Sequence, residues 1–358
     1  MSTPIVDSHV HLFPASHLPT LAWYGPNSPL GTQHSVNEYR HAALSVPTSA
    51  NTPGKYLRGF IFLETDRISS VDDRSGPGWK HALDEVSLLT RIALGEPEPG
   101  EGHSAVDKDL CLGIVPWAPV PGGPDVLQKY MAKVKERTKT DNIWRKVCGV
   151  RYLVQDKPAG VMLSTEFVDA LRWLGREGLA FDLGIDARQG GLHQLREAVE
   201  MMDKVYAGTE GNGLNIVINH LCKPNLRILP DSVSTHEEYL EWKNLITKMA
   251  SASESTYMKL SGAFAELPPL SRKVEPDISD LVSRLQPWTD VVFDAFGCER
   301  VMFGSDWPVC NVGGGGNDVS WNRWRRVIEE ILERRELTEE QKQGVWGQVA
   351  VKAYGVEL

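Results

Sequence analysis

Pro-Ile-Val-Asp-Ser-His-Val-His-Leu, residues 4–12, is the most informative segment of the chain. A short apolar run carries two histidines at positions i and i+2. Because alternate side chains of an extended strand point to the same face, His9 and His11 are expected to project together from one strand. Two neutral imidazoles on one face are suited to binding one divalent metal ion.

A second informative segment lies near the other end of the chain, where residues 300–308 read Arg-Val-Met-Phe-Gly-Ser-Asp-Trp-Pro. A short apolar strand is expected to end there at Asp306, before a turn formed by Trp-Pro. A histidine pair on a first strand is a weak signal when it stands alone. Combined with an aspartate that ends a last strand, it indicates a metal-assisted hydrolase built on a (β/α)8 barrel.

Eight short apolar runs recur along the chain, with helical patterns between most of them. Short buried strands that alternate with helices form a parallel sheet through right-handed crossovers, and eight such units close a barrel. An open doubly wound sheet is the alternative, but no GxGxxG motif follows the first strand. The chain is therefore predicted to be a single α/β domain, residues 1–358, with a TIM-barrel fold. The runs are Ile5–Leu12, Leu57–Thr65, Leu112–Trp117, Val147–Val154, Leu179–Ile185, Leu214–His220, Tyr257–Ser261 and Val301–Ser305.

Two long segments fit neither the strand nor the helix pattern. Residues 13–56 form a long loop after the first strand, at the end where barrels place their active sites, and are expected to help form the substrate pocket. Residues 95–110 are polar and acidic and are expected to be a mobile surface loop, with His103 at the surface. Asp66 and Arg67 are likewise expected to be a solvated pair or a cap.

Several helices can be placed from their end signals. Ser164 is expected to cap a helix that Gly178 stops. The chain is predicted to finish with extra helices, Trp321–Arg335 and Thr338–Tyr354, and Thr338-Glu-Glu-Gln reads as a capping box for the second of them.

Composition excludes several classes of partner. The 47 acidic and 38 basic residues give a formal charge of −9, which offers no basic stripe for nucleic acid and argues against docking on an anionic membrane. No window approaches the length of an apolar membrane span, and no signal segment precedes the first strand. The five cysteines are scattered and lack CxxC spacing, so reduced thiols in a cytoplasmic setting are expected.

Polar and charged residues end seven of the eight predicted strands. Such side chains are costly to bury without partners, and the carboxyl ends of barrel strands face the active site. Their convergence therefore predicts a catalytic site. In strand order they are His9 and His11, Glu64, Arg151, Asp182, His220, Lys259 and Asp306.

The segments that carry these residues resemble the amidohydrolase superfamily, and within it the amidohydrolase-2 branch that contains sugar lactonases. The resemblance covers all the predicted strands except the second and third, in the family's order. Two more segments, FLETDR (62–67) and LAWYGPNSPLGTQHSVNEY (21–39), are similar to the group of L-rhamnono-γ-lactonases. The matching strand segments are VDSHVHLF (6–13), GVRYLVQDKP (149–158), FDLGID (181–186), INHLCKP (218–224), MKLSG (258–262) and RVMFGSDWPVC (300–310).

The resemblance also implies a metal content. Binuclear members of the superfamily carry a carbamylated lysine on the fourth strand, where this chain has Arg151, which stays protonated and cannot bridge two ions. A single divalent ion, Zn²⁺ by preference, is expected, bound by His9, His11 and Glu64 with Asp306 close to it. Many mononuclear members use a fifth-strand histidine that this chain lacks, and lactonases of this branch include metal-independent members. Action without a metal is therefore the alternative.

Roles for the remaining residues follow from the same resemblance. Asp306 is expected to accept a proton from water and to return it to the leaving ring alkoxide. Arg151 and His220 are expected to stabilise the oxyanion or to hold the ring oxygens. A structural ion pair of Arg151 with Glu64 or Asp182 is the alternative for that residue. Contacts to sugar hydroxyls are expected from Trp23, Tyr24, His34, Asp182 and Lys259.

These roles describe hydrolysis of a small-molecule sugar aldonolactone, with conversion of L-rhamnono-1,4-lactone to L-rhamnonate as the preferred reaction. L-Fucono- and L-galactonolactones stay open, because one methylene in a pocket is worth only about 1–3 kcal/mol. A metal-dependent non-oxidative decarboxylase of an aromatic or muconate acid is the second hypothesis, and a non-catalytic carbohydrate-binding relative is the third. The absence of the fifth-strand histidine disfavours the decarboxylase. A homo-oligomer is left open.

Overall fold

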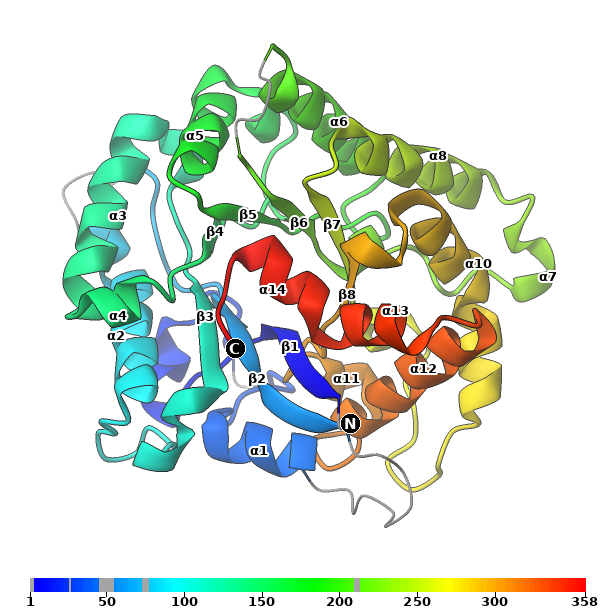
Figure 1. Ribbon diagram of the computed structural model, residues 1–358, viewed down its shortest axis with the longest axis horizontal. Helices are drawn as coiled ribbons and strands as arrows, with labels where there is room; N and C mark the ends of the chain where they lie inside the picture. The colour runs from blue at the N-terminus through cyan, green and yellow to red at the C-terminus, as the bar shows by residue number, and fades with distance from the viewer. Residues whose placement is uncertain (1–2, 26, 45–54, 73–76, 209–212) are drawn as a thin grey trace.

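Eight short parallel strands form the centre of the molecule (Figure 1). The structure, a computed structural model, describes residues 3–25, 27–44, 55–72, 77–208 and 213–358. Each strand overlaps one of the predicted apolar runs and ends slightly before it, so the residues at the ends of the runs lie just beyond the strands. The strands are β1 (Pro4–Val10), β2 (Tyr56–Leu63), β3 (Cys111–Val115), β4 (Gly149–Arg151), β5 (Ala180–Leu183), β6 (Ile216–Ile218), β7 (Thr256–Leu260) and β8 (Val301–Phe303).

The strands form two parallel sheets that meet at both edges. One sheet has the order β1-β2-β3 and the other β4-β5-β6-β7-β8. At one seam Ile114 pairs with Val147, and at the other Val10 pairs with Trp307, both in parallel register. These bridges join the first strand to the last, so the predicted barrel architecture is confirmed.

Long helices form the outer layer around the strands (Figure 1). They are α2 (Lys80–Leu94), α3 (Pro124–Thr138), α5 (Thr165–Arg176), α6 (His193–Tyr206), α8 (Glu237–Ala252), α10 (Ile278–Phe296) and α12 (Ser320–Arg334). The shorter helices are α1 (Val36–Leu44), α4 (Asp141–Trp144), α7 (Pro230–Val233), α9 (Ala263–Glu266), α11 (Cys310–Gly314), α13 (Glu339–Gln343) and α14 (Val349–Tyr354). Within the described ranges, no helix combines the length and the apolar character that crossing a membrane requires.

The predicted helix ends are confirmed by their caps. The Ser164 hydroxyl accepts a hydrogen bond from the Phe167 backbone at the start of α5, and Gly178 takes a left-handed φ of 71° after the end of that helix. Thr338 and Gln341 form the predicted capping box at the start of α13. A π-helical turn, Gly344–Gln348, joins α13 to α14.

The interior of the barrel is a separate apolar cluster that the C-terminal helix completes. Val6, Ile61, Val217 and Met302 come from four different strands, and Tyr354 of α14 packs against the same cluster. Apolar side chains from several strands filling the centre make a barrel core rather than a pore.

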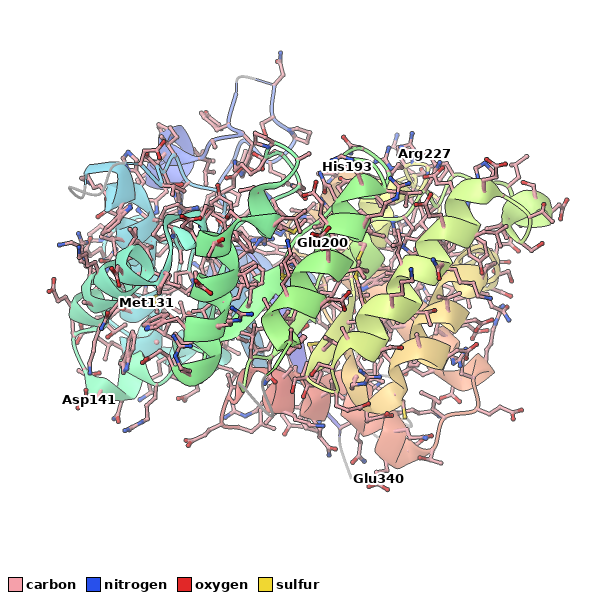
Figure 2. All side chains as sticks on the ribbon, turned by 90° about the horizontal axis from the view of Figure 1, so that it is seen from above. Met131, Asp141, His193, Glu200, Arg227 and Glu340 are labelled. Atoms are coloured by element: carbon pink, nitrogen blue, oxygen red, sulfur yellow. The ribbon has the colours of Figure 1, made fainter. Side chains whose placement is uncertain are left out.

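The last helices cover the end of the barrel at which the strands begin. Gly347, just before α14, lies against Pro4 and Val6 at the start of β1. Figure 2 places Glu340 of α13 at one end of the molecule and His193 at the other. The predicted extra C-terminal helices therefore leave the carboxyl ends of the strands accessible.

Residues 95–110 are not the mobile surface loop that their composition predicts. Glu101, His103 and Asp107 are all buried. The Arg91 guanidinium donates to Glu101, His103 lies 3.2 Å from the same carboxylate, and Asp107 completes a capping box with Ser104. The prediction is wrong because Glu101, His103 and Asp107 each find a partner inside the fold, which composition does not reveal.

Candidate functional site

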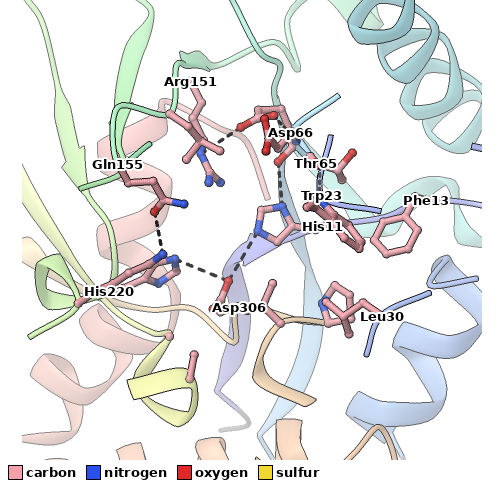
Figure 3. A pocket seen from close by; sticks show the side chains of 17 residues that line it. His11, Phe13, Trp23, Leu30, Thr65, Asp66, Arg151, Gln155, His220 and Asp306 are labelled. Carbon is pink, nitrogen blue, oxygen red and sulfur yellow. Dashed lines mark hydrogen bonds and ion pairs between the residues drawn. The ribbon is translucent and has the colours of Figure 1, made fainter. Parts of the chain in front are cut away.

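A cavity of about 300 Å³ lies at the carboxyl ends of the strands (Figure 3). Its wall is contributed by the segments that follow β1, β2, β4, β6, β7 and β8 and by the long early loop. Clefts at this face of the barrel are where TIM-barrel enzymes hold their substrates. The predicted site residues in the wall are His11, Trp23, Glu64, Arg151, His220 and Asp306.

His9 and His11 project together at the base of this cavity, as predicted. Their Nε2 atoms are 3.1 Å apart. The Nδ1 of His11 lies 3.0 Å from the Leu63 carbonyl and 2.9 Å from that of Glu64. Because carbonyl oxygens only accept hydrogen bonds, Nδ1 of His11 carries the proton, and its Nε2 presents a lone pair.

Asp306 is the carboxylate around which the site is arranged. Its Oδ1 lies 3.6 Å from the Nε2 atoms of His9, His11 and His220. Burial alone would raise the pKa of the Asp306 carboxyl, but the neighbouring imidazoles of His220 and His11 hold that pKa below its ordinary value. Asp306 is therefore ionised at neutral pH and able to accept a proton.

His9, His11 and Asp306 form a group able to hold a metal ion. Their ligand atoms all lie within 4.8 Å of one another. Two ligands of a tetrahedral zinc ion, each about 2.0–2.1 Å from it, are roughly 3.4 Å apart. The observed separations of 3.1 and 3.6 Å match this value, so the spacing and the types of donor fit a divalent ion.

The surroundings of His9 differ from those of His11. Lys259 Nζ lies 3.1 Å from Nδ1 of His9 and 2.7 Å from Oδ2 of Asp182. Burial, followed by the Lys259 charge, lowers the pKa of His9 well below its ordinary value, so the ring is neutral. An ammonium that donates to Nδ1 leaves the His9 proton on Nε2. An ion bound at His9 therefore needs that proton to leave, whereas His11 already presents its lone pair.

Glu64 faces Arg151 instead of the histidine pair. Its Oε1 lies 3.2 Å from Arg151 Nε, and its Oε2 accepts a hydrogen bond from the Asp66 backbone. Burial raises the pKa of the Glu64 carboxyl to about 8, against the opposing effect of Arg151. The prediction that Glu64 completes the metal ligands does not fit this placement. The structural alternative for Arg151, an ion pair with Glu64, does fit.

His220 opens a turn whose backbone is left-handed throughout. The φ angles of residues 220–223 are 56°, 54°, 60° and 48°, a conformation that costs roughly 1–2 kcal/mol for each residue with a side chain. The ring Nδ1 lies 2.7 Å from the Ser261 hydroxyl. A Cβ at residue 262 would approach the His220 ring to 2.6 Å, so this close packing requires the glycine found there.

Comparison with the sequence profiles of known families identifies the family of the chain. Residues 116–356 match the sequence profile of the family described as amidohydrolase, which is more than half of the chain. The chain belongs to the amidohydrolase family. The resemblance predicted from its strand segments is confirmed.

Individual relatives of this amidohydrolase include sugar lactonases. It is 33% identical over 354 residues to an L-rhamnono-gamma-lactonase of Scheffersomyces stipitis, covering 98% of both chains. It is 25% identical over 284 residues to an L-fucono-1,5-lactonase of Burkholderia multivorans, covering 78% of this chain and 86% of that one. A crystal structure of an amidohydrolase from Burkholderia multivorans with bound zinc has a TM-score of 0.63 at 23% identity, covering 99% of each chain.

Two residues predicted to contact sugar lie outside the cavity of this amidohydrolase. Asp182 and Lys259 are fully buried beneath His9 and do not belong to the described cavity wall. Residues at the ends of barrel strands alternate between the mouth and the interior, and the strand pattern does not distinguish these positions. Their predicted contact with sugar hydroxyls is therefore corrected: Lys259 contacts His9, and Asp182 pairs with Lys259.

The early loop contributes to the cavity as predicted, but of its three predicted residues only Trp23 belongs to the described wall. Trp23 lines the cavity and donates from Nε1 to the Thr65 carbonyl at 3.0 Å. Tyr24 is 41% exposed, and His34 packs between Phe13 and Trp307. Neither belongs to the wall formed by the described residues. Part of the predicted loop, residues 45–54, lies outside the described residues.

Sequence reasoning missed four polar residues of the cavity wall. They are Thr65, Asp66, Gln155 and Lys223, and each lies in a loop beyond a strand end. Arg67, also predicted to be solvated, is buried and pairs with Glu85 at 2.8 Å. Gln155 and Lys223 stand within the family-like segments at 149–158 and 218–224, which was the available signal.

Proposed function

We propose that this amidohydrolase is a sugar lactonase that hydrolyses an aldonolactone, with L-rhamnono-1,4-lactone as the preferred substrate. The observation that carries the proposal is Asp306, an ionised carboxylate among three imidazoles at the base of a cavity. The 33% identity to an L-rhamnono-gamma-lactonase over nearly the whole chain supports the choice of substrate.

Asp306 acts as the general base in this proposal. It takes a proton from the attacking water and returns it to the ring oxygen when the acyl–oxygen bond breaks. His220 is neutral because burial lowers its pKa to about 3, so its imidazole contributes a hydrogen bond without a charge. Arg151 supplies a fixed positive charge at the same cavity wall, suited to an oxyanion.

A divalent ion, zinc by preference, would be held by His9, His11 and Asp306. When bound there, such an ion supplies Lewis acidity toward the lactone carbonyl and makes water easier to deprotonate. The chain's own residues keep the roles given above, and Lys259 and the Leu63 carbonyl hold the two imidazoles from behind.

The cavity has one apolar side that suits a deoxy sugar. Phe13, Leu30 and Val309 contribute apolar side chains to the wall, and Phe13 and Leu30 lie on the side away from Arg151, Gln155 and His220 (Figure 3). The methyl group of a 6-deoxy aldonolactone is favoured by such a wall, whereas a hydroxymethyl group would bury an unpaired hydroxyl. We therefore expect L-rhamnono- and L-fuconolactone to be better substrates than L-galactonolactone.

The first test is hydrolysis of these three lactones, followed by acid release in weak buffer and corrected for spontaneous opening. Asp306→Asn is the matched control and should lower kcat by about 10³-fold or more while keeping the fold. Parallel samples are treated with chelator and then restored with Zn²⁺. Activity that is lost with chelator and restored by zinc would support a catalytic metal ion. Activity that does not change on chelation would support catalysis by the side chains of the protein alone.

An enzyme that opens none of these lactones would contradict the proposal. The same preparation would then be assayed for carbon dioxide release from an aromatic carboxylic acid such as 2,6-dihydroxybenzoate. Release that Asp306→Asn abolishes would assign the site to decarboxylation.

A further inference from the structure

Lys223 is a charged residue of the cavity wall to which the mechanism above gives no role. It ends the left-handed turn that begins with His220, and both residues line the cavity. The His220 Nε2 lies 3.6 Å from Asp306 Oδ1, so the turn runs past the general base. A strained backbone segment at a functional site is a reason to ask what it positions.

The left-handed turn is held by groups outside the Lys223 side chain. The Trp242 indole donates to the Leu221 carbonyl at 2.9 Å. The Ala187 backbone donates to the Cys222 carbonyl at 2.9 Å, and the backbone of residue 188 donates to that of Lys223 at 3.1 Å. Because these bonds involve the backbone of the turn, removal of the Lys223 ammonium leaves its conformation supported.

The ammonium group of Lys223 uses only some of its hydrogen-bond donors. Among the described residues, Lys223 Nζ donates one hydrogen bond, to Gln155 Oε1 at 2.7 Å, and lies 3.7 Å from Asp186 Oδ2. An ammonium has three donors and no acceptor, so donors are left for an occupant of the cavity. Gln155 lines the same cavity, and its side chain reaches toward the space between Arg151 and His220 (Figure 3).

The charged residues of the cavity wall differ in the hydrogen bonds they offer. Arg151 and Lys223 only donate, whereas Asp66 and Asp306 accept when ionised. Sugar hydroxyls can both donate and accept, but the acyl oxygen of a lactone only accepts. The residues that only donate therefore suit the acyl oxygen, which gains negative charge as the water adds.

We propose that Lys223, positioned by Gln155, binds the acyl oxygen of the lactone and afterwards the carboxylate of the released aldonate. This role rests on the proposed lactonase activity. The water oxygen bonds to the acyl carbon as Asp306 takes its proton. The acyl–ring-oxygen bond then breaks, and Asp306 returns the proton to the ring oxygen. Lys223 keeps its own protons and neutralises the charge on the acyl oxygen.

The test compares Lys223→Met and Lys223→Arg with the unmodified enzyme on L-rhamnono-1,4-lactone, measuring kcat, KM and the Ki of L-rhamnonate. Lys223→Met should lower kcat by about 10²–10³-fold, the usual effect of losing one oxyanion donor. It should raise the Ki of the aldonate by about tenfold or more, because a charge-assisted contact to the carboxylate is lost. Lys223→Arg should recover part of both, since it keeps the charge.

Matched variants separate this role from a structural one. Lys204→Met removes a lysine that pairs with Glu200 on the outer face of α6 and should match the unmodified enzyme in every constant. Gln155→Leu keeps the lysine but frees its head group, so the Ki should rise by a smaller factor at an unchanged melting temperature.

Three results would overturn the assignment in different ways. If the unmodified enzyme opens the lactone and Lys223→Met keeps its kcat and its Ki, Lys223 does not bind the acyl oxygen, although the lactonase proposal stands. If Lys223→Met unfolds, the Ki of L-rhamnonate is compared between the unmodified enzyme and the variants Gln155→Leu and Lys223→Arg. A Ki that is unchanged in both variants rejects the role of Lys223. If the unmodified enzyme opens no aldonolactone, the proposed function fails and this role fails with it.

Discussion

Two buried ion pairs lie close to the histidine pair, and they differ in their position relative to the cavity and in their hydrogen-bond partners. Lys259 and Asp182 are 2.7 Å apart and fully buried. Arg151 and Glu64 are 3.2 Å apart and line the cavity. In the second pair Glu64 Oε1 and two guanidinium nitrogens of Arg151 have no aligned hydrogen-bond partner among the described residues.

The difference separates a pair that serves the fold from a pair prepared for a ligand. The Asp182 carboxylate also accepts hydrogen bonds from Asn219 and Tyr354, so both of its oxygens are hydrogen-bonded. Buried polar groups with hydrogen-bond partners stabilise one arrangement, whereas buried groups without aligned partners are expensive to leave alone. Arg151 therefore has donors to offer a substrate, whereas Lys259 lies outside the described cavity wall and directs its hydrogen bonds to His9 and Asp182.

The largest effect is expected from breaking the first pair. The Lys259 charge holds the pKa of Asp182 below its ordinary value against the opposing effect of burial, so Lys259→Met leaves an ionised carboxylate without its cation. Removing one partner of a buried pair costs about 3–5 kcal/mol. Urea unfolding should show this loss, and the double variant with Asp182→Leu should be more stable than the single one. A single variant as stable as the unmodified protein would contradict the structural role.

Breaking the second pair should affect turnover more than stability. Arg151→Met leaves Glu64 behind, but burial raises the pKa of that carboxyl to about 8 even with Arg151 in place, so at neutral pH the variant leaves a mostly protonated side chain and no uncompensated charge. We expect kcat to fall by about 10²–10³-fold, equivalent to about 2.7–4 kcal/mol, with a smaller loss of stability than for Lys259→Met. Lactone assays and urea unfolding of the same two samples test the contrast. If Arg151→Met lost as much stability in urea as Lys259→Met, the two pairs would not differ in the way proposed.

The two carboxyls should also give opposite signs of pH dependence. Glu64 has a raised pKa, so its contribution to stability is greatest below pH 4.5 and is lost as pH rises toward 8. Asp182 has a lowered pKa, so its contribution is constant above pH 4 and is lost only in acid. Between pH 5 and 7 the unmodified protein should lose on the order of 2 kcal/mol relative to Glu64→Gln. Parallel pH profiles for the two proteins would contradict the raised pKa of Glu64.

The barrel could be predicted from sequence because each strand is a local signal. Runs such as Leu57–Thr65 are apolar, short and bounded by breakers, and eight of them are the number that a closed barrel needs. The burial of Glu101 and His103 could not be predicted, since it depends on Arg91 and on contacts between segments that are distant in sequence.

The site could be predicted in part for the same reason. His9, His11 and Asp306 end strands, and the topology of a barrel brings strand ends together. The partner of each side chain could not be predicted, because a shift of one position moves a residue between the cavity and the interior. The sequence predicts a metal ion as the partner of Glu64 and a sugar as the partner of Lys259, whereas the structure pairs them with Arg151 and Asp182.

The smallest effect is expected from Tyr354, which ties the C-terminal helix to the first ion pair. Its hydroxyl donates to Asp182, and burial raises the pKa of Tyr354 well above its ordinary value, so it remains a donor. Tyr354→Phe should cost about 1.5 kcal/mol in urea unfolding, the value of one hydrogen bond to a charged group, because Lys259 and Asn219 still hold the carboxylate. The kcat and KM for the lactone should stay within about twofold of the unmodified enzyme, since an uncoupled structural contact leaves the cavity unchanged. A tenfold fall in kcat at an unchanged melting temperature would mean that the hydrogen bonds from Asp182 through Lys259 to His9 take part in turnover. The two ion pairs would then serve a single reaction, and burial alone would not distinguish their roles.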